Sequence, residues 1–209
     1  MTRLKIWMLI AGISFWPGAL FGAGGDAKTG IIKGTITIAG KPTRDVVVSV
    51  EGLPKEQSKL QLSGNNPKAV MNQKDLKFIP SVLAIVVGTT VDFPNDDKTF
   101  HNIFSTSAAK KFDLGLYPSG QSRSVTFDKV GVVRILCNVH PNMEAYVVVK
   151  SHPYFSVPDS RGNYSLNGIP LGKYRIEVWH PELGTSATSV ELVRGGEVLA
   201  INVDLKKER

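Results

Sequence analysis

Residues 132–143 read VVRILCNVHPNM, an apolar run followed at once by a short loop with three side chains that can bind metal. The aliphatic, β-branched run Val132–Leu136 favours a strand. The loop then presents the Cys137 thiol, the His140 imidazole and the Met143 thioether, with two residues between each pair. This pattern predicts a strand that ends in a metal-binding loop.

A second imidazole lies upstream, in a stretch that reads NDDKTFHN over residues 95–102 and contains His101. One thiolate, two imidazoles and a weak axial thioether suit copper in an electron-transfer site, because soft sulfur stabilises Cu(I) while imidazole keeps Cu(II) acceptable. Zinc is more often held by several cysteines, or by a closed tetrahedral set without a thioether. The donor types therefore point to copper.

Alternation of apolar and polar residues continues on both sides of these two stretches. Ile36 and Ile38 alternate with threonines, and Ile201–Leu205 alternates with an asparagine and an aspartate. Further strands are predicted at Asp45–Val50, Val82–Val87, Thr90–Phe93, Ser124–Phe127, Tyr146–Val149, Tyr174–Val178 and Val190–Val193. So many short strands predict an all-β chain built of sandwiches or barrels. The polar stretch Pro54–Lys77 is predicted to be a linker with at most one helical turn.

Composition narrows the classes of function. The 209 residues are 42% hydrophobic, enough for one large or two small cores. A net charge of +7 without a long basic block argues against nucleic-acid binding and leaves an acidic partner surface open. The chain has one cysteine, which excludes an intrachain disulfide and a zinc site built of several cysteines.

The N-terminus has the pattern of a secretory signal peptide over residues 1–24. Arg3 and Lys5 precede a short apolar run that Pro17 interrupts, and small residues follow. A retained N-terminal anchor is the alternative, but the run is too short to span a bilayer. We therefore expect a periplasmic or secreted protein without stable membrane insertion, whose net charge falls from +7 to +5 after cleavage.

Residues 78–149 resemble a plastocyanin-type cupredoxin. The matching pieces are the run Val86–Asn95, the pair His101–Asn102 and the loop Cys137–Met143. The spacing around His140 is most similar to the short ligand loop of amicyanins. The resemblance implies a Greek-key β-sandwich that carries single electrons between redox partners, with no bond-breaking catalysis.

The same resemblance implies roles for individual residues. It makes His101, Cys137 and His140 the equatorial ligands of one type 1 (blue) copper and Met143 the axial ligand. It also implies that Asn102 hydrogen-bonds across to the cysteine loop and holds the two loops in register.

The loop also suggests where electrons leave. Pro141 turns the chain sharply, so His140 is expected to present its ring edge to solvent while the upstream histidine lies deeper. Around it Val139, Pro141, Leu116 and Pro118 are expected to form a small apolar patch. Such a patch suits a weak encounter with a redox protein, for example a dehydrogenase or a cytochrome, whose surface is acidic.

A second resemblance involves both ends of the chain. Residues 159–178 are similar to the second half of a carboxypeptidase-regulatory-like (transthyretin-like) sandwich, and the first half of that pattern stands at Ile31–Gly52. The economical interpretation inserts the cupredoxin into this smaller sandwich; a tandem arrangement with a separate N-terminal hairpin is the alternative. The predicted boundaries are 28–54 and 152–209 for the regulatory-like sandwich, 55–67 for a linker and 68–151 for the cupredoxin.

Other interpretations of the same residues remain open. A lone cysteine is most often a small buried hydrophobe, and a lone methionine is most often core filler. Cys137 with His140 as base could suggest a thiol hydrolase, although no third orienting group is evident. A module that stores or senses copper is a further alternative. His152 and His180, each followed by proline, are expected to be ordinary turn histidines.

Overall fold

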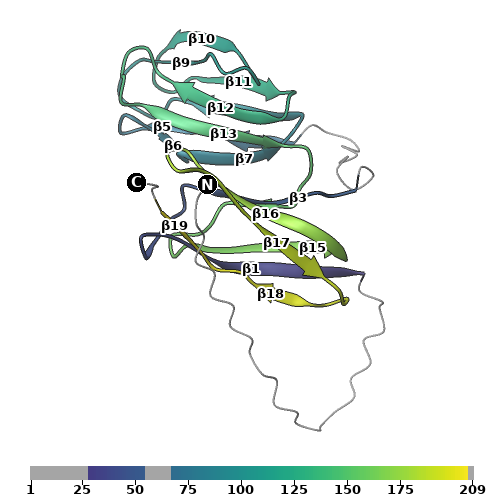
Figure 1. Ribbon diagram of the computed structural model, residues 1–209. Coiled ribbons are helices and arrows are strands. Elements are labelled where there is room, and N and C mark those ends of the chain that lie inside the picture. The colour runs from purple at the N-terminus through teal and green to yellow at the C-terminus, as the bar shows by residue number, and fades with distance from the viewer. Residues whose placement is uncertain (1–27, 55–66, 207–209) are drawn as a thin grey trace, which may run out of the picture. The chain divides into compact units, whose positions relative to one another are not determined.

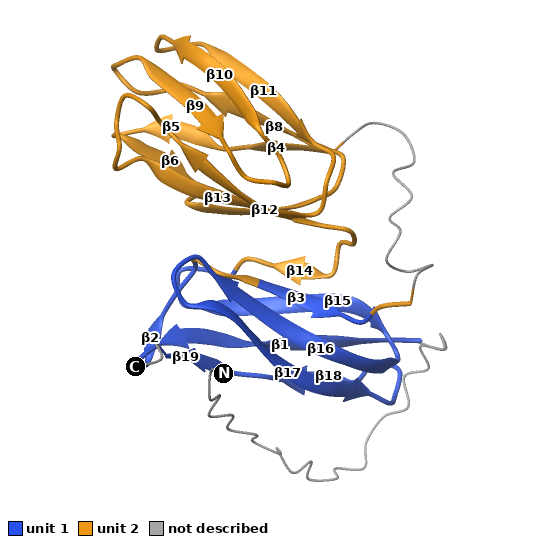
Figure 2. Ribbon diagram, turned by 45° about the horizontal axis from the view of Figure 1, so that its top comes forward, with its two compact units in different colours: residues 1–44, 48–52, 158–209 blue, residues 45–47, 53–157 orange. Residues whose placement is uncertain are grey.

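The computed structural model describes residues 28–54 and 67–206 of the chain. These residues form strands, turns and loops, with no helix among them (Figure 1). They divide into two compact units that alternate along the sequence (Figure 2): unit 1 comprises the described residues 28–44, 48–52 and 158–206, and unit 2 comprises the described residues 45–47, 53–54 and 67–157. In the part of the chain described here, no helix has the length and hydrophobicity needed to cross a membrane.

Unit 2 contains two main sheets. Its strands are β4 (Lys68–Val70), β5 (Asn72–Lys74), β6 (Lys77–Ile79), β7 (Val82–Val86), β8 (Thr89–Pro94), β9 (His101–Ser105), β10 (Phe112–Tyr117), β11 (Ser122–Phe127), β12 (Gly131–Leu136) and β13 (Glu144–Lys150). One sheet has the order β10–β9–β12–β13–β7 and the other has the order β11–β8–β4, while β5 and β6 form a separate hairpin. The two-residue strand β14 (Phe155–Ser156) follows.

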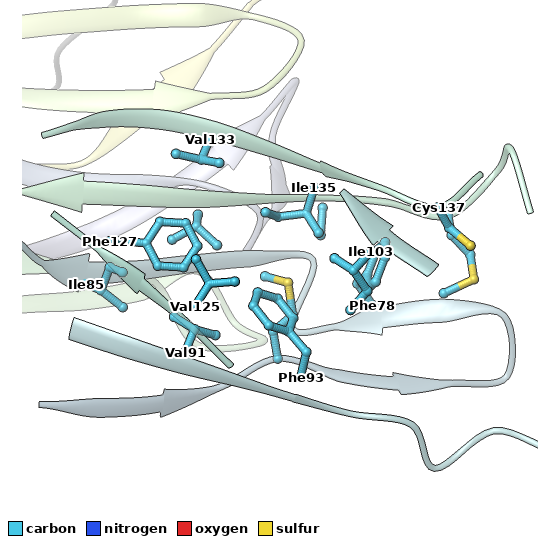
Figure 3. Packing of buried hydrophobic residues seen from close by; sticks show 14 of the residues in the cluster. Phe78, Ile85, Val91, Phe93, Ile103, Val125, Phe127, Val133, Ile135 and Cys137 are labelled. Carbon is cyan, nitrogen blue, oxygen red and sulfur yellow. The ribbon is translucent and has the colours of Figure 1, made fainter. Parts of the chain in front are cut away.

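Both sheets of unit 2 contribute to one core, which makes this unit a β-sandwich. In β12 the alternation read from the sequence places Val133 and Ile135 inside and Arg134 outside, since successive side chains of a strand point to opposite faces. Phe93 and Phe127 from the other sheet are fully buried in the same cluster. Figure 3 shows this packing, with Cys137 at one end of it.

The order of the strands brings the two donor loops together. Strands β9 and β12 are antiparallel neighbours, with Leu136 opposite Phe104. The beginning of β9, at His101, therefore lies beside the end of β12, where Cys137 follows. The loop 137–143 then returns the chain into β13, whose residues 144–149 pair with all six residues of β12.

Unit 1 is built from early and late segments of the chain. Its strands are β1 (Thr29–Ile38), β2 (Lys41–Pro42), β3 (Val47–Glu51, residues 48–51 of which belong to this unit), β15 (Asn163–Pro170), β16 (Gly172–His180), β17 (Gly184–Leu192), β18 (Val198–Ala200) and β19 (Val203–Leu205). Strand β1 pairs with β15, β18, β19 and β2, and β3, β16 and β17 lie next to one another in another sheet. The chain therefore completes the sheet around β1 only near residue 205.

A glycine allows the close approach of β1 to the C-terminal segment. A Cβ on Gly34 would lie 1.9 Å from the carbonyl oxygen of Ile201. The Tyr164 hydroxyl donates a hydrogen bond to the same oxygen at 2.8 Å, and Tyr164 is the β15 residue opposite Gly34. Only glycine leaves room for the two segments at this point.

Several predictions from the sequence were wrong in detail. The predicted linker Pro54–Lys77 contains strands β4 and β5, because Gln73 is buried by tertiary hydrogen bonds that no local pattern reveals. The predicted strand Val190–Val193 is the end of the longer strand β17. The predicted signal peptide, residues 1–24, lies outside the described residues, as does most of the linker 55–67. The assignment of unit 1 to the regulatory-like family stays a prediction.

Candidate metal centre

Three side chains from two loops of unit 2 converge on one point. The Sγ atom of Cys137 is 3.9 Å from Nδ1 of His101 and 3.9 Å from Nδ1 of His140. The two Nδ1 atoms are 3.0 Å apart, and the two rings meet edge to face at 64°. Each residue thus directs a donor atom toward the same small space, and together they form a group that could hold a metal ion.

The spacing of these donors fits a three-coordinate metal. Metal–nitrogen bonds are about 2.0 Å long and metal–sulfur bonds about 2.3 Å long. A point at these distances from the three donors has angles that add up to roughly 357°, close to the 360° of a planar trigonal centre. One sulfur and two imidazoles in a trigonal arrangement are typical of blue copper sites.

The two histidines differ in exposure. His101 has no solvent-exposed surface, whereas His140 is partly exposed. Cys137 is 5% exposed and belongs to the edge of the core. The difference agrees with the expectation that His140 lies nearer to solvent. The thiol is buried as a small hydrophobe would be, yet its sulfur also faces two ring nitrogens.

Asp97 contacts His101 from the side opposite to the thiol. Its Oδ2 atom is 3.1 Å from His101 Nε2. The pKa of Asp97 is lowered, chiefly by a hydrogen bond from the Leu76 backbone and also by bonds from Lys98 and His101. Sequence reasoning missed this residue, and the available signal was an acidic side chain four residues before a candidate ligand.

Asn102 differs from its predicted role. Its Nδ2 donates a hydrogen bond of 2.6 Å to Asp113 Oδ1 rather than to the cysteine loop. Its own Oδ1 is buried and has no hydrogen-bond partner among the described residues. The reason is the irregular pairing of β9 with β10, which brings the Asp113 carboxylate within reach of the amide. The expected bridge to the cysteine loop is therefore absent from the hydrogen bonds of this side chain.

Met143 closes the loop at its far end. Its backbone N–H donates to the carbonyl of His140 at 2.9 Å, and its side chain is 1% exposed within the core cluster that also contains Cys137. This placement agrees both with an axial ligand and with core filling. Its role as a ligand stays a prediction.

The residues of the predicted apolar patch are accessible to different degrees. Val139 and Leu116 are 48% and 55% exposed, Pro141 is exposed, and Pro118 is half-buried. Phe100, which precedes the ligand candidate His101, is 52% exposed, and sequence reasoning missed it. Exposed aromatic and aliphatic side chains thus flank both histidine positions along the chain.

A buried tyrosine lies on the strand next to His101. Tyr117 is paired with His101 between β10 and β9. Its hydroxyl accepts a hydrogen bond from Gln73 Nε2 at 2.6 Å and donates one to the Phe93 carbonyl at 2.9 Å. Burial raises the pKa of Tyr117 to about 12. This network joins β5 and β8 to β10, the strand that pairs with β9 at His101.

The remaining histidines have turn-like surroundings. His152 Nδ1 accepts a hydrogen bond from the Tyr154 backbone N–H at 3.3 Å. His180 Nδ1 accepts bonds from the backbone N–H groups of Glu182 and Leu183, both at 3.1 Å. One ring nitrogen of each residue is therefore engaged by its own turn, as expected from the proline that follows each histidine.

Comparison with known proteins shows which family unit 2 is similar to. Residues 66–150 match the family described as copper binding proteins of the plastocyanin/azurin family. This segment contains all three converging donors. The segment is therefore similar to the copper-binding domains of that family, and copper is its cofactor. No sequence among curated proteins matches the chain.

Solved structures also resemble part of the chain. A purple cupredoxin from Nitrosopumilus maritimus is 29% identical over 39% of this chain and 99% of its own, with a TM-score of 0.36. A copper-containing nitrite reductase from Thermus scotoductus SA-01 is 28% identical over 40% of this chain and 22% of its own, with a TM-score of 0.38. A reduced amicyanin variant is 21% identical over 49% of this chain and 98% of its own, with a TM-score of 0.38.

Proposed function

We propose that the chain is an exported blue copper protein whose unit 2 carries single electrons between redox partners. In this proposal His101, Cys137 and His140 are the equatorial ligands of one type 1 copper, and Met143 is the axial ligand. The observation that supports it is the convergence of one sulfur and two Nδ1 atoms at 3.0 to 3.9 Å from one another. These donors lie within the segment that matches the copper-binding family.

The proposed role of His101, Cys137 and His140 is to hold the copper in a fixed geometry. When bound, copper supplies the chemistry by exchanging one electron between Cu(II) and Cu(I). The three donors converge because β9 and β12 hold His101 and Cys137 on neighbouring strands. A site that moves little lowers the reorganisation needed for electron transfer. The buried position of the thiol excludes water from the ligand sulfur.

Electrons leave, in this proposal, through the partly exposed imidazole of His140. Exposed Val139 and Pro141 lie on either side of it in the loop, and Leu116 and Pro118 belong to the same patch in the proposal. A small apolar surface suits a redox partner that binds weakly and leaves fast, and the net positive charge steers an acidic partner. Changing Val139 to glutamine should slow electron exchange and leave the copper spectrum nearly unchanged.

Two other functions use the same residues. A thiol hydrolase is favoured by one observation: Cys137, His101 and Asp97 follow one another in the order nucleophile, base and orienting acid. Against it, a second imidazole nitrogen faces the same sulfur, which is the arrangement of a metal site. A module that stores or senses copper would release the metal on reduction, whereas a carrier stays loaded through repeated redox cycles.

The proposal also assigns roles to residues 1–24 and to unit 1. Residues 1–24 act as a signal peptide, which sends the protein to the periplasm or out of the cell. Unit 1 is a regulatory-like sandwich without catalytic function. Support comes from the pairing of β1 with β15, which joins the two sequence segments that resemble the halves of that sandwich.

The visible and electron paramagnetic resonance spectra of the protein loaded with Cu(II) test the proposal. We expect an intense thiolate-to-copper charge-transfer band, which Cys137→Ser abolishes because only the thiolate supplies it. His152→Gln serves as a control, since it changes a histidine outside the metal-binding group and should keep the band. Wild-type protein that binds Cu(II) without colour contradicts the proposal. A redox titration over several cycles then separates a carrier from a storage protein.

A further inference from the structure

The two imidazoles of the metal-binding group have different surroundings at their second nitrogen. His101 Nε2 is 3.1 Å from Asp97 Oδ2 and is fully buried. His140 is partly exposed, and among residues 28–54 and 67–206 the contacts of its ring are those with His101 and Cys137. One ring thus has a carboxylate behind it, and the other belongs to a partly exposed residue.

The chemistry of imidazole decides what the carboxylate does. A neutral ring carries one N–H and one lone pair, so His101 can bind a metal through Nδ1 only if the proton is on Nε2. Nδ1 is the atom that faces Cys137 Sγ. The Nε2–H group is buried and needs an acceptor, because an unpaired buried N–H is costly. Asp97 Oδ2 is that acceptor.

Asp97 is itself held in a fixed orientation. The Leu76 backbone N–H donates to Oδ2 at 2.8 Å, and the Lys98 backbone N–H donates to Oδ1 at 2.8 Å. Its own N–H donates to Asn95 Oδ1 at 3.1 Å. Leu76 stands at the tip of the β5–β6 hairpin with a left-handed φ of 56°, which is uncommon for leucine. An unusual turn therefore supplies one of the donors that orient this carboxylate.

We propose that Asp97 is a positioning residue that fixes His101 with its proton on Nε2 and makes Nδ1 a stronger donor, which lowers the reduction potential of the copper. The proposal rests on the proposed function, in which His101 is a ligand. A carboxylate behind a ligating imidazole orients the ring and raises its basicity. A more basic donor stabilises Cu(II) more than Cu(I), because Cu(II) carries the higher charge.

The variant Asp97→Asn tests this role, and Asp96→Asn is its matched control. Asp96 is the next residue, and its Oδ2 accepts a hydrogen bond from Asn72 Nδ2 at 2.7 Å. Both variants remove one negative charge at neighbouring positions, but only Asp97 contacts His101. For Asp97→Asn we expect the ratio of Cu(II) to Cu(I) affinity to fall about tenfold, which raises the potential by about 59 mV for a one-electron couple. Asp96→Asn should shift the potential much less.

Nitrogen NMR of the metal-free protein gives a second measurement that does not depend on copper. We expect the His101 ring to have its proton on Nε2 in the wild type, with an N–H signal that exchanges slowly with water. Asp97→Asn should weaken the hydrogen bond, which speeds that exchange, and Asp96→Asn should leave the signal unchanged. The wild-type spectrum alone decides the position of the proton if the Asp97 variant does not fold.

The results separate this proposal from the proposed function. Equal shifts of potential in the two variants would mean that charge alone acts, and would overturn the role of Asp97. A proton on Nδ1 of His101 in the metal-free wild type would overturn it as well. A wild-type protein without the thiolate band refutes the electron-carrier proposal, whereas the NMR result still reports on how Asp97 positions His101.

Discussion

Replacing Tyr117 by phenylalanine tests the hydrogen-bond network that joins Gln73, Tyr117 and Phe93. The change keeps the buried ring, over which the Arg123 guanidinium lies at 5.0 Å from the centroid. It removes the hydroxyl that accepts from Gln73 and donates to the Phe93 carbonyl. Both partners are left buried with one bond fewer. We expect the free energy of unfolding to fall by about 1–3 kcal/mol near neutral pH.

Ionisation of Tyr117 should also make the unfolding free energy of the wild type depend on pH, and the Tyr117→Phe variant should lack this contribution. Burial raises the pKa of Tyr117 from 10.0 to about 12 in the folded protein. Since the folded pKa lies above the unfolded value, this stabilisation is fully present below about pH 10 and is lost as the pH rises toward about 12. At pH 11 the loss amounts to about 1.4 kcal/mol, and at higher pH it approaches about 2.7 kcal/mol. Phenylalanine has no proton to lose, so it lacks this contribution.

Urea unfolding of the wild type and of Tyr117→Phe at pH 8 and pH 11 measures the effect. The difference in unfolding free energy between the two proteins should shrink by about 1.4 kcal/mol between the two pH values. Tyr164→Phe is the control in unit 1, where burial also raises the pKa and the hydroxyl bonds to the Ile201 carbonyl. That variant should leave the contribution of Tyr117 intact. A wild-type to Tyr117→Phe difference that is the same at both pH values refutes the reasoning.

Three further changes test other parts of the structure. Gly34→Ala should lower the unfolding free energy by about 3 kcal/mol, because its Cβ would lie 1.9 Å from the Ile201 carbonyl oxygen. Gly30→Ala should cost less, about 1 kcal/mol in urea unfolding, because its Cβ would lie 2.8 Å from a flexible methyl group of Leu192 and 3.0 Å from the Glu197 carbonyl oxygen. Met143→Leu should keep the charge-transfer band and raise the reduction potential measured by voltammetry, since losing a weak sulfur donor disfavours Cu(II); an unchanged potential would show that Met143 is not axial. A fragment of residues 155–209 should show no cooperative unfolding by circular dichroism, because it lacks strand β1.

The sequence predicted those features that depend on local pattern. Strand β12 was predictable because Val133 and Ile135 alternate with an exposed arginine, and burial of one face imposes this period. The donors of the metal-binding group were predictable because few chemistries require a thiol and an imidazole three positions apart after a strand. The convergence of His101 with Cys137 required only that their strands be neighbours.

The features that were not predicted correctly depend on contacts between residues far apart in the sequence or across loops. The sequence gives no sign that Gln73 belongs to a buried strand, because its polar side chain is accommodated by Tyr117 and Pro94. The partner of Asn102 could not be predicted either, since it depends on the irregular pairing that brings Asp113 close. The same holds for Asp97, whose carboxylate reaches His101 only because of the loop conformation. Hydrogen bonds across loops follow from the fold and leave no periodic trace in the sequence.

The pairing of β1 has a consequence for the order in which the chain is made. Ile31 of β1 pairs with Val198 of β18, 167 positions later. At an elongation rate of about 5–20 residues per second, β18 is synthesised roughly 8–33 s after β1. All strands of unit 2 are synthesised before β18. During this interval β1 has an unpaired edge and the apolar side chains of Ile32 and Ile36, a combination that invites pairing with other chains. A ribosome that stalls before β18 would leave this edge open, so the protein is most exposed to aggregation late in its own synthesis.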